Sequence, residues 1–173
     1  MFHPQRTLNC NGKLLDLEQP VVMGILNVTP DSFFDGGHYV GESAVLQQVE
    51  SMLAAGASII DIGGMSSRPG AKIISDEEEL SRVIPVIELI IKKFPDIIIS
   101  IDTVKSVVAR RSTEAGVSIV NDISAGRLDK NLYETVADLG VPYVLMHMQG
   151  TPGDMQKNPV YEDVTQEVLD FFI

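Results

Sequence analysis

Short apolar runs alternate with helical patterns through most of the 173-residue chain, and this rhythm constrains the fold more than any other feature. The expected strands are residues 21–26, 58–62, 97–101, 118–123 and 142–146, and the expected helices are 42–55, 75–91, 104–115, 131–139 and 162–172. Strands that are apolar along most of their length and alternate with amphipathic helices are typical of a parallel sheet covered by helices. The sequence therefore predicts an α/β fold. Periodicity alone leaves open both a doubly wound sheet and a (β/α) barrel.

Local signals mark the ends of several elements. Asn11 and Gly12 form a turn pair, so residues 2–18 are expected to form a β-hairpin ahead of the alternation. Ser75 and Glu78 have the spacing of a helix-capping box, and the helix that follows contains Pro85, which predicts a kink. No low-complexity linker interrupts the chain, so residues 1–173 are expected to belong to a single domain.

Acidic residues outnumber basic ones by 24 to 13, which gives a formal net charge of −11. This balance argues against nucleic acid or an anionic membrane surface as a partner, although one arginine or a helix N-terminus can still bind a small anion. The single cysteine, Cys10, cannot form an internal disulfide. The N-terminal segment lacks the apolar core of a signal peptide, and no apolar run approaches the ~18 residues of a membrane span. We expect a cytoplasmic protein without a membrane partner.

Polar residues stand at or just beyond the end of each expected strand. They are Asn27, Asp61, Asp102, the pair Asn121 and Asp122, and His147. The carboxyl ends of parallel strands form the ligand-binding edge in both doubly wound sheets and barrels. Each of these residues alone could instead cap a helix or bind loop backbone. As a set, they predict a polar ligand at this edge.

These residues suit different tasks. Asp102 is either the N-cap of the next helix or a carboxylate that accepts from N–H groups and stabilises a developing positive charge. Asn121 offers donors and an acceptor, which suits the edge of a heterocycle, whereas Asp122 is expected to structure its loop. Asp61 is expected to orient its loop neighbours. His147 lies between two methionines and is interpreted as a core histidine without a catalytic role.

Two loops beyond the first and second strands carry further candidate ligands. Residues 28–37 hold two aspartates and two phenylalanines, and residues 63–71 read GGMSSRPGA. The hydroxyls of Ser66 and Ser67 and the Arg68 guanidinium would suit an anion or a carboxylate. The sequence has no Walker or dinucleotide-binding glycine motif, no zinc-ligand spacing and no G-x-S-x-G motif. These features argue against a nicotinamide-dependent or P-loop enzyme.

A set of segments in a fixed order resembles the dihydropteroate synthase family. The segments are Asn27-Val-Thr-Pro-Asp-Ser-Phe33, Asp35-Gly-Gly37, Asp61-Ile-Gly-Gly64, Ser67-Arg-Pro-Gly70, Ile101-Asp-Thr103, Asn121-Asp-Ile123 and Leu145-Met-His-Met-Gln-Gly150. The similarity extends from about residue 12 to the end of the chain. It implies a (β/α)₈ barrel, and so decides by analogy between the two architectures left open above.

The resemblance implies a transferase of folate biosynthesis with Mg²⁺ as its cofactor. Such an enzyme joins 6-hydroxymethyl-7,8-dihydropterin diphosphate to p-aminobenzoate, giving 7,8-dihydropteroate and diphosphate. In the family pattern, Asp102 and Asn121 hold the pterin ring, and Ile123 and Met146 pack nearby. Departure of diphosphate leaves positive charge on the pterin methylene, so the Asp102 carboxylate would support an SN1-like reaction.

The same resemblance assigns the metal and the second substrate. Asn27 would meet diphosphate and Mg²⁺, and Asp35 would complete the protein ligands of the metal, so that the catalytic set is Asp102, Asn27 and Asp35. The p-aminobenzoate pocket, at which sulfonamides compete, would be formed by Phe33, Ser67, Arg68 and Pro69.

The chain departs from the family pattern in a few residues and in length. Met65 and Ser67 stand where the family often has Glu and Thr, and Phe34 where Ser or another residue is common, so aminobenzoate contacts are expected to differ slightly. A complete barrel has eight βα units and about 250 residues, whereas this chain supplies roughly five units. We therefore expect the N-terminal part of a pterin-binding barrel domain, an incomplete barrel preceded by a β-hairpin and without the C-terminal βα units.

The reduced length has two consequences, and two alternative functions stay open beside the synthase. Open barrel edges favour a homodimer or other self-association, and the chain alone is expected to have little activity. One alternative is a pterin-binding methyltransferase domain, which would not need the loops at residues 28–37 and 63–71. The other is a non-catalytic pterin-binding module.

Overall fold

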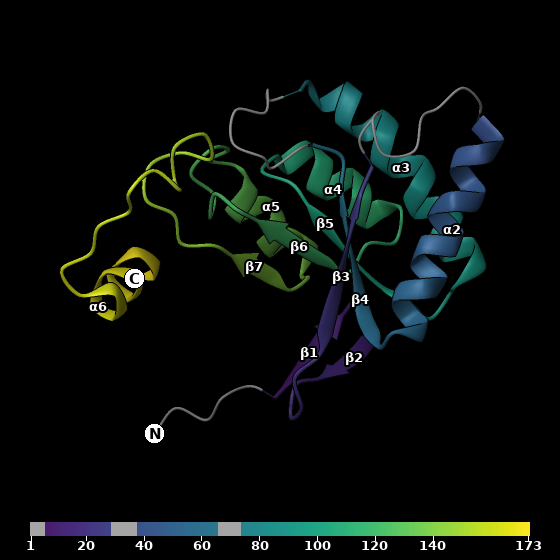
Figure 1. Ribbon diagram of the computed structural model, residues 1–173, viewed down its shortest axis with the longest axis horizontal. Coiled ribbons are helices and arrows are strands. Elements are labelled where there is room, and N and C mark those ends of the chain that lie inside the picture. The colour runs from purple at the N-terminus through teal and green to yellow at the C-terminus, as the bar shows by residue number, and fades with distance from the viewer. Residues whose placement is uncertain (1–5, 29–37, 66–73) are drawn as a thin grey trace.

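The computed structural model describes residues 6–28, 38–65 and 74–173 (Figure 1). The strands are β1 Thr7–Cys10, β2 Lys13–Asp16, β3 Val22–Asn27, β4 Ala57–Gly63, β5 Ile98–Asp102, β6 Ile119–Asp122 and β7 Tyr143–Leu145. The helices are α2 His38–Ala54, α3 Asp76–Lys93, α4 Ser106–Glu114, α5 Leu132–Leu139 and α6 Val164–Phe172. The predicted alternation of strands and helices is confirmed.

Individual boundaries differ from the prediction by a few residues. Helix α2 begins at His38 rather than at residue 42, and α4 begins at Ser106 rather than at residue 104. Ser75 caps α3, because its Oγ accepts a hydrogen bond from the Glu78 N–H at 3.2 Å. Pro85 lies inside α3, which continues as one helix on both sides of it. The kink at Pro85 stays a prediction.

The N-terminal hairpin forms as predicted, within narrower limits. Strand β1 pairs antiparallel with β2, and the turn between them places Asn11 at φ 53° and Gly12 at φ 87°. Both values are positive, as a two-residue hairpin turn that follows the strand twist requires. The Gly12 N–H donates to Asn9 Oδ1 at 2.7 Å, which closes the turn.

The hairpin covers the amino ends of the parallel strands. Cys10 and Leu15 are buried in a cluster with side chains at the start of β4, β5 and β6, namely Ile59, Ile98 and Ile119. Lys13 Nζ donates to the carbonyl oxygens of Pro95 at 2.7 Å and Ile97 at 2.8 Å. The hairpin is thus fixed to the α3–β5 connection as well as to the strand ends.

The parallel sheet has the order β3-β4-β5-β6-β7, which is also the order of these strands along the chain. A doubly wound sheet reverses its strand order at a switch point and carries helices on both faces. Here each strand adds to the same edge, and α2, α3, α4 and α5 lie on one side of the sheet (Figure 1). The arrangement is that of successive βα units in a barrel.

Alternate strand residues face the helices and form the main core. From the strands this core contains Leu26, Ile60, Ile62, Ile99, Ile101 and Val120, and from the helices Val45, Val49, Val83, Ile87, Ile90, Val108, Ala109, Leu132 and Val136. Two glycines allow close approach. A Cβ at Gly24 would lie 2.9 Å from Met52 Sδ, and one at Gly64 would lie 2.6 Å from Val83 Cγ1.

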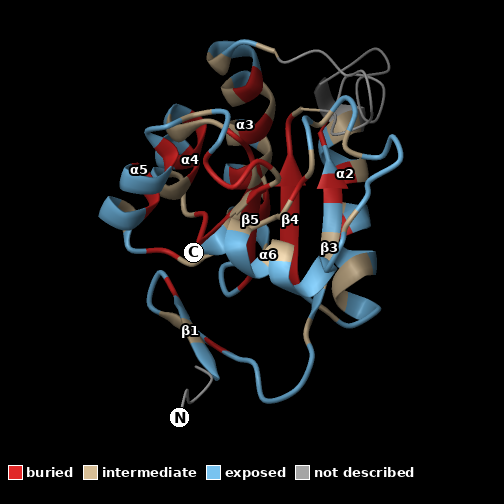
Figure 2. Ribbon diagram, turned by 90° about the vertical axis from the view of Figure 1, so that its left-hand side faces the viewer, coloured by how far each residue is buried: buried red, intermediate tan, exposed pale blue. Residues whose placement is uncertain are grey.

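The other face of the sheet is open near its outer strands. Ile25 on β3 and Val144 on β7 keep 64% and 42% of their surface exposed. Figure 2 shows β4 largely buried and β3 largely exposed. Since side chains alternate between the two faces of a strand, these residues belong to the face that lines the interior of a closed barrel.

Helix α6 lies apart from the helix layer and contains no buried residue (Figure 1). Its Phe171 packs edge-on against His147, with ring centroids 4.8 Å apart, and the Arg127 guanidinium lies 5.8 Å from the centre of the Phe171 ring. Among the described residues, no helix has both the length and the apolar character needed to cross a membrane.

Candidate functional site

Three of the predicted strand-end residues fall in one row across the sheet, together with Gly63. The register pairs Asn27 with Gly63, Gly63 with Asp102, and Asp102 with Asn121. All four lie at the carboxyl ends of their strands, on the face opposite the helices. The row therefore presents an amide, an open backbone position, a carboxylate and a second amide along the expected ligand edge.

Gly63 keeps the centre of this row open. A Cβ built on Gly63 would lie 3.2 Å from Asn27 Oδ1 and 3.5 Å from Asp102 Oδ2. Both oxygens therefore reach toward the same space above Gly63, from the strands on either side. A side chain at this position would crowd Asn27 Oδ1 and fill the space next to Asp102 Oδ2, so the glycine is explained by the space it leaves.

The electrostatic environment of Asp102 is unusual for a carboxylate. Burial raises the pKa of Asp102 to about 7, and the nearby charges of Asp61, Glu79 and Asp122 add to the increase. Asp102 does not cap the following helix, because the N-cap of α4 is Lys105. Of the two interpretations of Asp102, a helix cap and a ligand-binding carboxylate, the structure excludes the cap.

Asn121 is held by a side chain from a strand that is not its neighbour. Its Nδ2 donates to Asp61 Oδ2 at 2.9 Å, which links β6 to β4 across β5 on the inner face of the sheet. Asp61 is buried, and burial raises its pKa while the side chains of Ser100 and Asn121 oppose the increase. This contact with Asn121 was not predicted, and the expectation that Asp61 orients its loop neighbours stays a prediction, because most of that loop lies outside the described residues.

Asp122 points to the opposite face and organises the loop after β6, as predicted. Its Oδ1 accepts from the N–H and the hydroxyl of Ser124, both at 2.7 Å, and its Oδ2 accepts from the Gly126 N–H at 2.6 Å and the Tyr143 hydroxyl at 2.7 Å. Burial and the bond to Asp122 raise the pKa of Tyr143. This network fixes the backbone on which Ile123 lies.

Ile123 and Met146 lie just beyond the carboxyl ends of β6 and β7, and both are half-buried. The Met146 N–H donates to the Asp122 carbonyl at 3.2 Å, so the two strand exits are joined there. His147 follows directly and is half-buried against Phe171 and Tyr161. It is therefore not the core histidine that the sequence suggested, because it lies outside the helix-facing core.

A buried ion pair lies behind Asp102. Glu79 of α3 is fully buried, accepts from the Thr103 hydroxyl at 2.7 Å, and has Oε2 3.1 Å from Lys105 Nζ. Lys105 Nζ also donates to the Ile74 carbonyl, at 2.5 Å. This cluster anchors the described end of the β4–α3 connection next to the strand that carries Asp102.

Sequence reasoning missed Glu79, although a signal was present. Glu79, Val83, Ile87 and Ile90 share the buried face of α3, so an acidic residue occupies an otherwise apolar helical stripe. A carboxylate in that position is expected to have a specific partner inside the fold.

The remaining predicted site residues lie outside the described residues. They are Phe33 and Asp35 in the β3–α2 connection and Ser67, Arg68 and Pro69 in the β4–α3 connection. Phe34, which the sequence left without a role, also falls there. Their assignments to the metal and to p-aminobenzoate stay predictions. Met65, the other departure from the family pattern, is described and half-buried.

The described residues fit a magnesium site only in part. Asn27 is exposed at the end of β3, and its Oδ1 reaches the space over Gly63, where a hard oxygen ligand is available. Among the described residues, no group of three or more His, Cys, Asp or Glu gathers as a metal cluster. Mg²⁺ usually keeps several waters and takes one or two protein oxygens with substrate phosphates, so this sparse donor set suits its chemistry.

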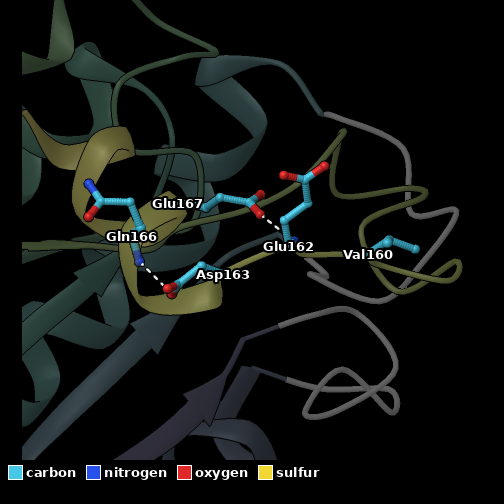
Figure 3. A pocket seen from close by; sticks show the side chains of 5 residues that line it. All are labelled: Val160, Glu162, Asp163, Gln166 and Glu167. Atoms are coloured by element: carbon cyan, nitrogen blue, oxygen red, sulfur yellow. Dashed lines mark hydrogen bonds between the residues drawn. The ribbon is translucent and has the colours of Figure 1, made fainter.

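A separate surface hollow lies near α6, away from the strand row. It is lined by Val160, Glu162, Asp163, Gln166 and Glu167 (Figure 3). Asp163 Oδ1 accepts from the Gln166 N–H at 3.1 Å, and Glu167 Oε1 accepts from the Glu162 N–H at 2.8 Å. Both carboxylates therefore serve the helix N-terminus, and the hollow is not a candidate ligand site.

Comparison with known proteins supports the resemblance found in the sequence. The family model described as pterin binding enzyme matches residues 23–173. The dihydropteroate synthase of Haemophilus influenzae is 50% identical over 164 residues, which cover 95% of this chain and 59% of that protein.

Solved structures agree with the sequence comparison. The crystal structure of the Yersinia pestis dihydropteroate synthase with a sulfonamide drug complex matches with a TM-score of 0.83 and 46% identity, covering 96% of this chain and 59% of that one. The Xanthomonas albilineans dihydropteroate synthase with 4-aminobenzoic acid matches with a TM-score of 0.82 and 43% identity, covering 97% and 58%.

The fold and the family follow from these matches. The five-stranded sheet with its helices corresponds to part of the (β/α)₈ barrel of the matched structures, so the barrel is incomplete here, as the sequence predicted. The chain spans less than three fifths of the length of these relatives. With a family model that matches most of its residues, this chain belongs to the family of pterin-binding enzymes.

Proposed function

We propose that the chain contributes the pterin-binding half of a dihydropteroate synthase site. The reaction joins 6-hydroxymethyl-7,8-dihydropterin diphosphate to p-aminobenzoate, with release of diphosphate. The observation that carries the proposal is the row of Asn27, Gly63, Asp102 and Asn121 at the carboxyl ends of adjacent strands. The 50% sequence identity with the Haemophilus influenzae dihydropteroate synthase supports the proposal.

Asp102 and Asn121 would bind the pterin ring. A pterin presents N–H donors and ring acceptors on one edge, and a carboxylate beside an amide complements such an edge. The pKa of Asp102 is about 7 without a ligand, and hydrogen bonds from the pterin would favour its charged form. The half-buried Ile123 and Met146 at the strand exits would supply apolar contacts to the ring.

The same carboxylate fits an SN1-like reaction. Departure of diphosphate leaves positive charge on the pterin system, and a fixed negative group in a partly buried site stabilises this charge. The aniline nitrogen of p-aminobenzoate is a competent nucleophile once it is held in place, so no strong general base is needed.

Asn27, together with Asp35, would hold Mg²⁺. The metal would supply positive charge to the diphosphate leaving group. The exposed Oδ1 of Asn27 lies at the open position over Gly63, which is compatible with such a role.

Phe33, Ser67, Arg68 and Pro69 would form the p-aminobenzoate pocket. An arginine between small hydroxyl residues suits the carboxylate of that substrate, and sulfonamides would compete for the same place. The solved relatives with a sulfonamide drug complex and with 4-aminobenzoic acid support binding of these two kinds of ligand. The single buried Cys10 is consistent with the reducing cytoplasm as the compartment.

A second candidate function has one observation in its favour. The exposed Ile25 and Val144 show that the interior face is not closed over by described residues, which favours a pterin-binding module without turnover for the chain by itself. Both candidates bind pterin, and they differ in catalysis.

Synthase assays on two polypeptides distinguish these functions. The first is the 173-residue chain, and the second is this chain continued by the C-terminal part of the Haemophilus influenzae relative. We expect little or no dihydropteroate from the first and sulfonamide-sensitive turnover from the second. In the continued chain, Asp102→Ala should lower kcat by a factor of roughly 100 or more. A folded continued chain without synthase activity, or with activity that Asp102→Ala leaves unchanged, would contradict the proposal.

A further inference from the structure

The contact between Asp61 and Asn121 has no role in the function proposed above. Asp61 lies two residues before Gly63 on β4, and its register partner on β5 is Ser100, two residues before Asp102. It therefore occupies the layer directly beneath the ligand-binding row. Its Oδ2 accepts from Asn121 Nδ2 at 2.9 Å.

This contact decides how the Asn121 amide is turned. In the structure the Asn121 nitrogen faces Asp61, and the carboxylate oxygen Oδ2 accepts the hydrogen bond from it. The carbonyl oxygen of Asn121 and its second N–H are left for other partners. Without Asp61, rotation of the amide by half a turn would exchange the positions of oxygen and nitrogen at little cost.

A purely structural role explains Asp61 poorly. Burying a carboxylate costs more than burying a neutral acceptor, and no basic side chain accompanies Asp61 in its recorded hydrogen bond. Its Oδ1 has no hydrogen-bond partner among the residues that the structure describes, nor has the Oγ of Ser100. Burial of the Asp61 carboxylate costs free energy, and its position beneath the Asn121 amide is better explained if the carboxylate fixes the orientation of that amide.

We propose that Asp61 is a positioning residue, which fixes the Asn121 amide with its oxygen available to accept a hydrogen bond from an N–H group of the bound pterin. The inference rests on the proposed function, because the ligand that forms a hydrogen bond with the Asn121 amide is the pterin. It adds a specificity requirement, namely that the heterocycle must present a donor to Asn121.

A double-mutant cycle tests whether Asp61 acts through Asn121. The 173-residue chain is titrated with the fluorescent probe 6-hydroxymethylpterin, and the dissociation constant is measured for the wild type, Asp61→Ala, Asn121→Ala and the double variant. We expect Asp61→Ala to weaken binding about tenfold, and the double variant to bind no more weakly than Asn121→Ala alone. Independent, multiplicative losses would overturn the inference.

Two further variants separate positioning from general damage to the fold. Asp61→Asn keeps an acceptor for Asn121 Nδ2, so it should bind within about threefold of the wild type. Ser112→Ala removes a buried hydroxyl on α4, on the helix side of the sheet, and leaves Asp61 and Asn121 intact, so it should also bind normally. Circular dichroism and thermal unfolding of each variant confirm that the fold is present. Loss of binding in Asp61→Asn as large as in Asp61→Ala would contradict the positioning role.

The hydrogen bond can also be observed without ligand. In nitrogen-15 NMR spectra of the 173-residue chain, the two Nδ2 protons of Asn121 should be distinct and slow to exchange, and Asp61→Ala should remove this protection. Unchanged signals would overturn the inference even if pterin binds. A different outcome is a wild-type chain that shows the protected Asn121 amide and yet fails to bind 6-hydroxymethylpterin. That result would contradict the proposed function and the claim that the Asn121 oxygen accepts from the pterin.

Discussion

Asp102 is the residue on which the chemistry of the site depends most. Its carboxylate is partly buried, its pKa is raised to about 7, and it lies beside Gly63, whose missing side chain leaves room for a ligand. The charge on Asp102 is therefore unfavourable in the ligand-free protein. A ligand that brings N–H donors would relieve this cost, which couples binding to release of a proton.

This coupling predicts a pH dependence of stability. Because the pKa of Asp102 is raised, the native state holds its proton more tightly than the unfolded state does. The stabilisation from that proton is fully present below about pH 4 and is lost as pH rises through about 7. Asp102→Asn should remove this loss, and so be more stable than the wild type at pH 8 by on the order of a few kcal/mol, at about 1.4 kcal/mol per pKa unit.

Urea unfolding at pH 5 and pH 8 measures the effect. The exposed Asp96 provides a matched control, and Asp96→Asn should leave the wild-type difference between the two pH values unchanged. A wild type that is more stable than Asp102→Asn at pH 8 would contradict the described environment of Asp102.

At the scale of elements, the loop after β6 depends on one buried carboxylate. Asp122 accepts four hydrogen bonds, from two backbone N–H groups and from the hydroxyls of Ser124 and Tyr143. We expect Asp122→Ala to lower the free energy of unfolding by about 3 kcal/mol, because several buried donors lose their partner at once. Tyr143→Phe removes one of these bonds and should cost about 1 kcal/mol. Chemical denaturation that gives equal losses for both variants would show that the network does not hold the loop.

The hairpin makes a second prediction at this scale. Leu15 is 7% exposed and packs beneath the parallel strands, whereas its neighbour Leu14 is 76% exposed. Leu15→Ala should lower the free energy of unfolding by about 2 to 4 kcal/mol, and Leu14→Ala by less than about 0.5 kcal/mol. Thermal and urea unfolding of the pair test this. Similar effects at both positions would mean that the hairpin does not cover the strand ends as described.

Local patterns predicted the elements well, because each depended on neighbours in sequence. The turn at Asn11 and Gly12 and the cap at Ser75 are confirmed, as are the strand-end positions of Asn27, Asp102 and Asn121. Asp61 instead lies two residues before the end of β4. Contacts between distant residues could not be predicted in the same way. The hydrogen bond from Asn121 to Asp61 joins side chains 60 positions apart, and it depends on a register that no local pattern specifies.

The site shows the same division. Its row of Asn27, Asp102 and Asn121 followed from strand ends alone, since parallel strands bring their carboxyl ends together. The choice between a barrel and a doubly wound sheet was decided by the family resemblance, because strand order is a property of the whole chain. The interpretation of His147 as a core residue was wrong, because two flanking methionines do not decide which way a residue after the strand end faces.

For the whole molecule, the open interior face predicts self-association. Ile25 and Val144 are exposed on the same face of the sheet, and the chain spans 59% of its Haemophilus influenzae relative. We expect sedimentation velocity to show concentration-dependent association of the 173-residue chain. Ile25→Ser with Val144→Ser should weaken this association about tenfold through the loss of apolar surface. Val107→Ser, at an exposed position on α4, is the matched control and should have no effect. A strictly monomeric wild type, or equal effects of all these changes, would contradict this expectation.

The central claim is that the row at the carboxyl ends of β3 to β6 binds a pterin, and calorimetric titration tests it most directly. 6-Hydroxymethylpterin is titrated into the 173-residue chain, into Asp102→Ala, and into Ser112→Ala, whose buried hydroxyl lies on α4 away from the row. The account predicts binding of one pterin per chain, at least about tenfold weaker in Asp102→Ala and unchanged in Ser112→Ala. Absence of binding to the wild type, or equal affinity in Asp102→Ala, would contradict it.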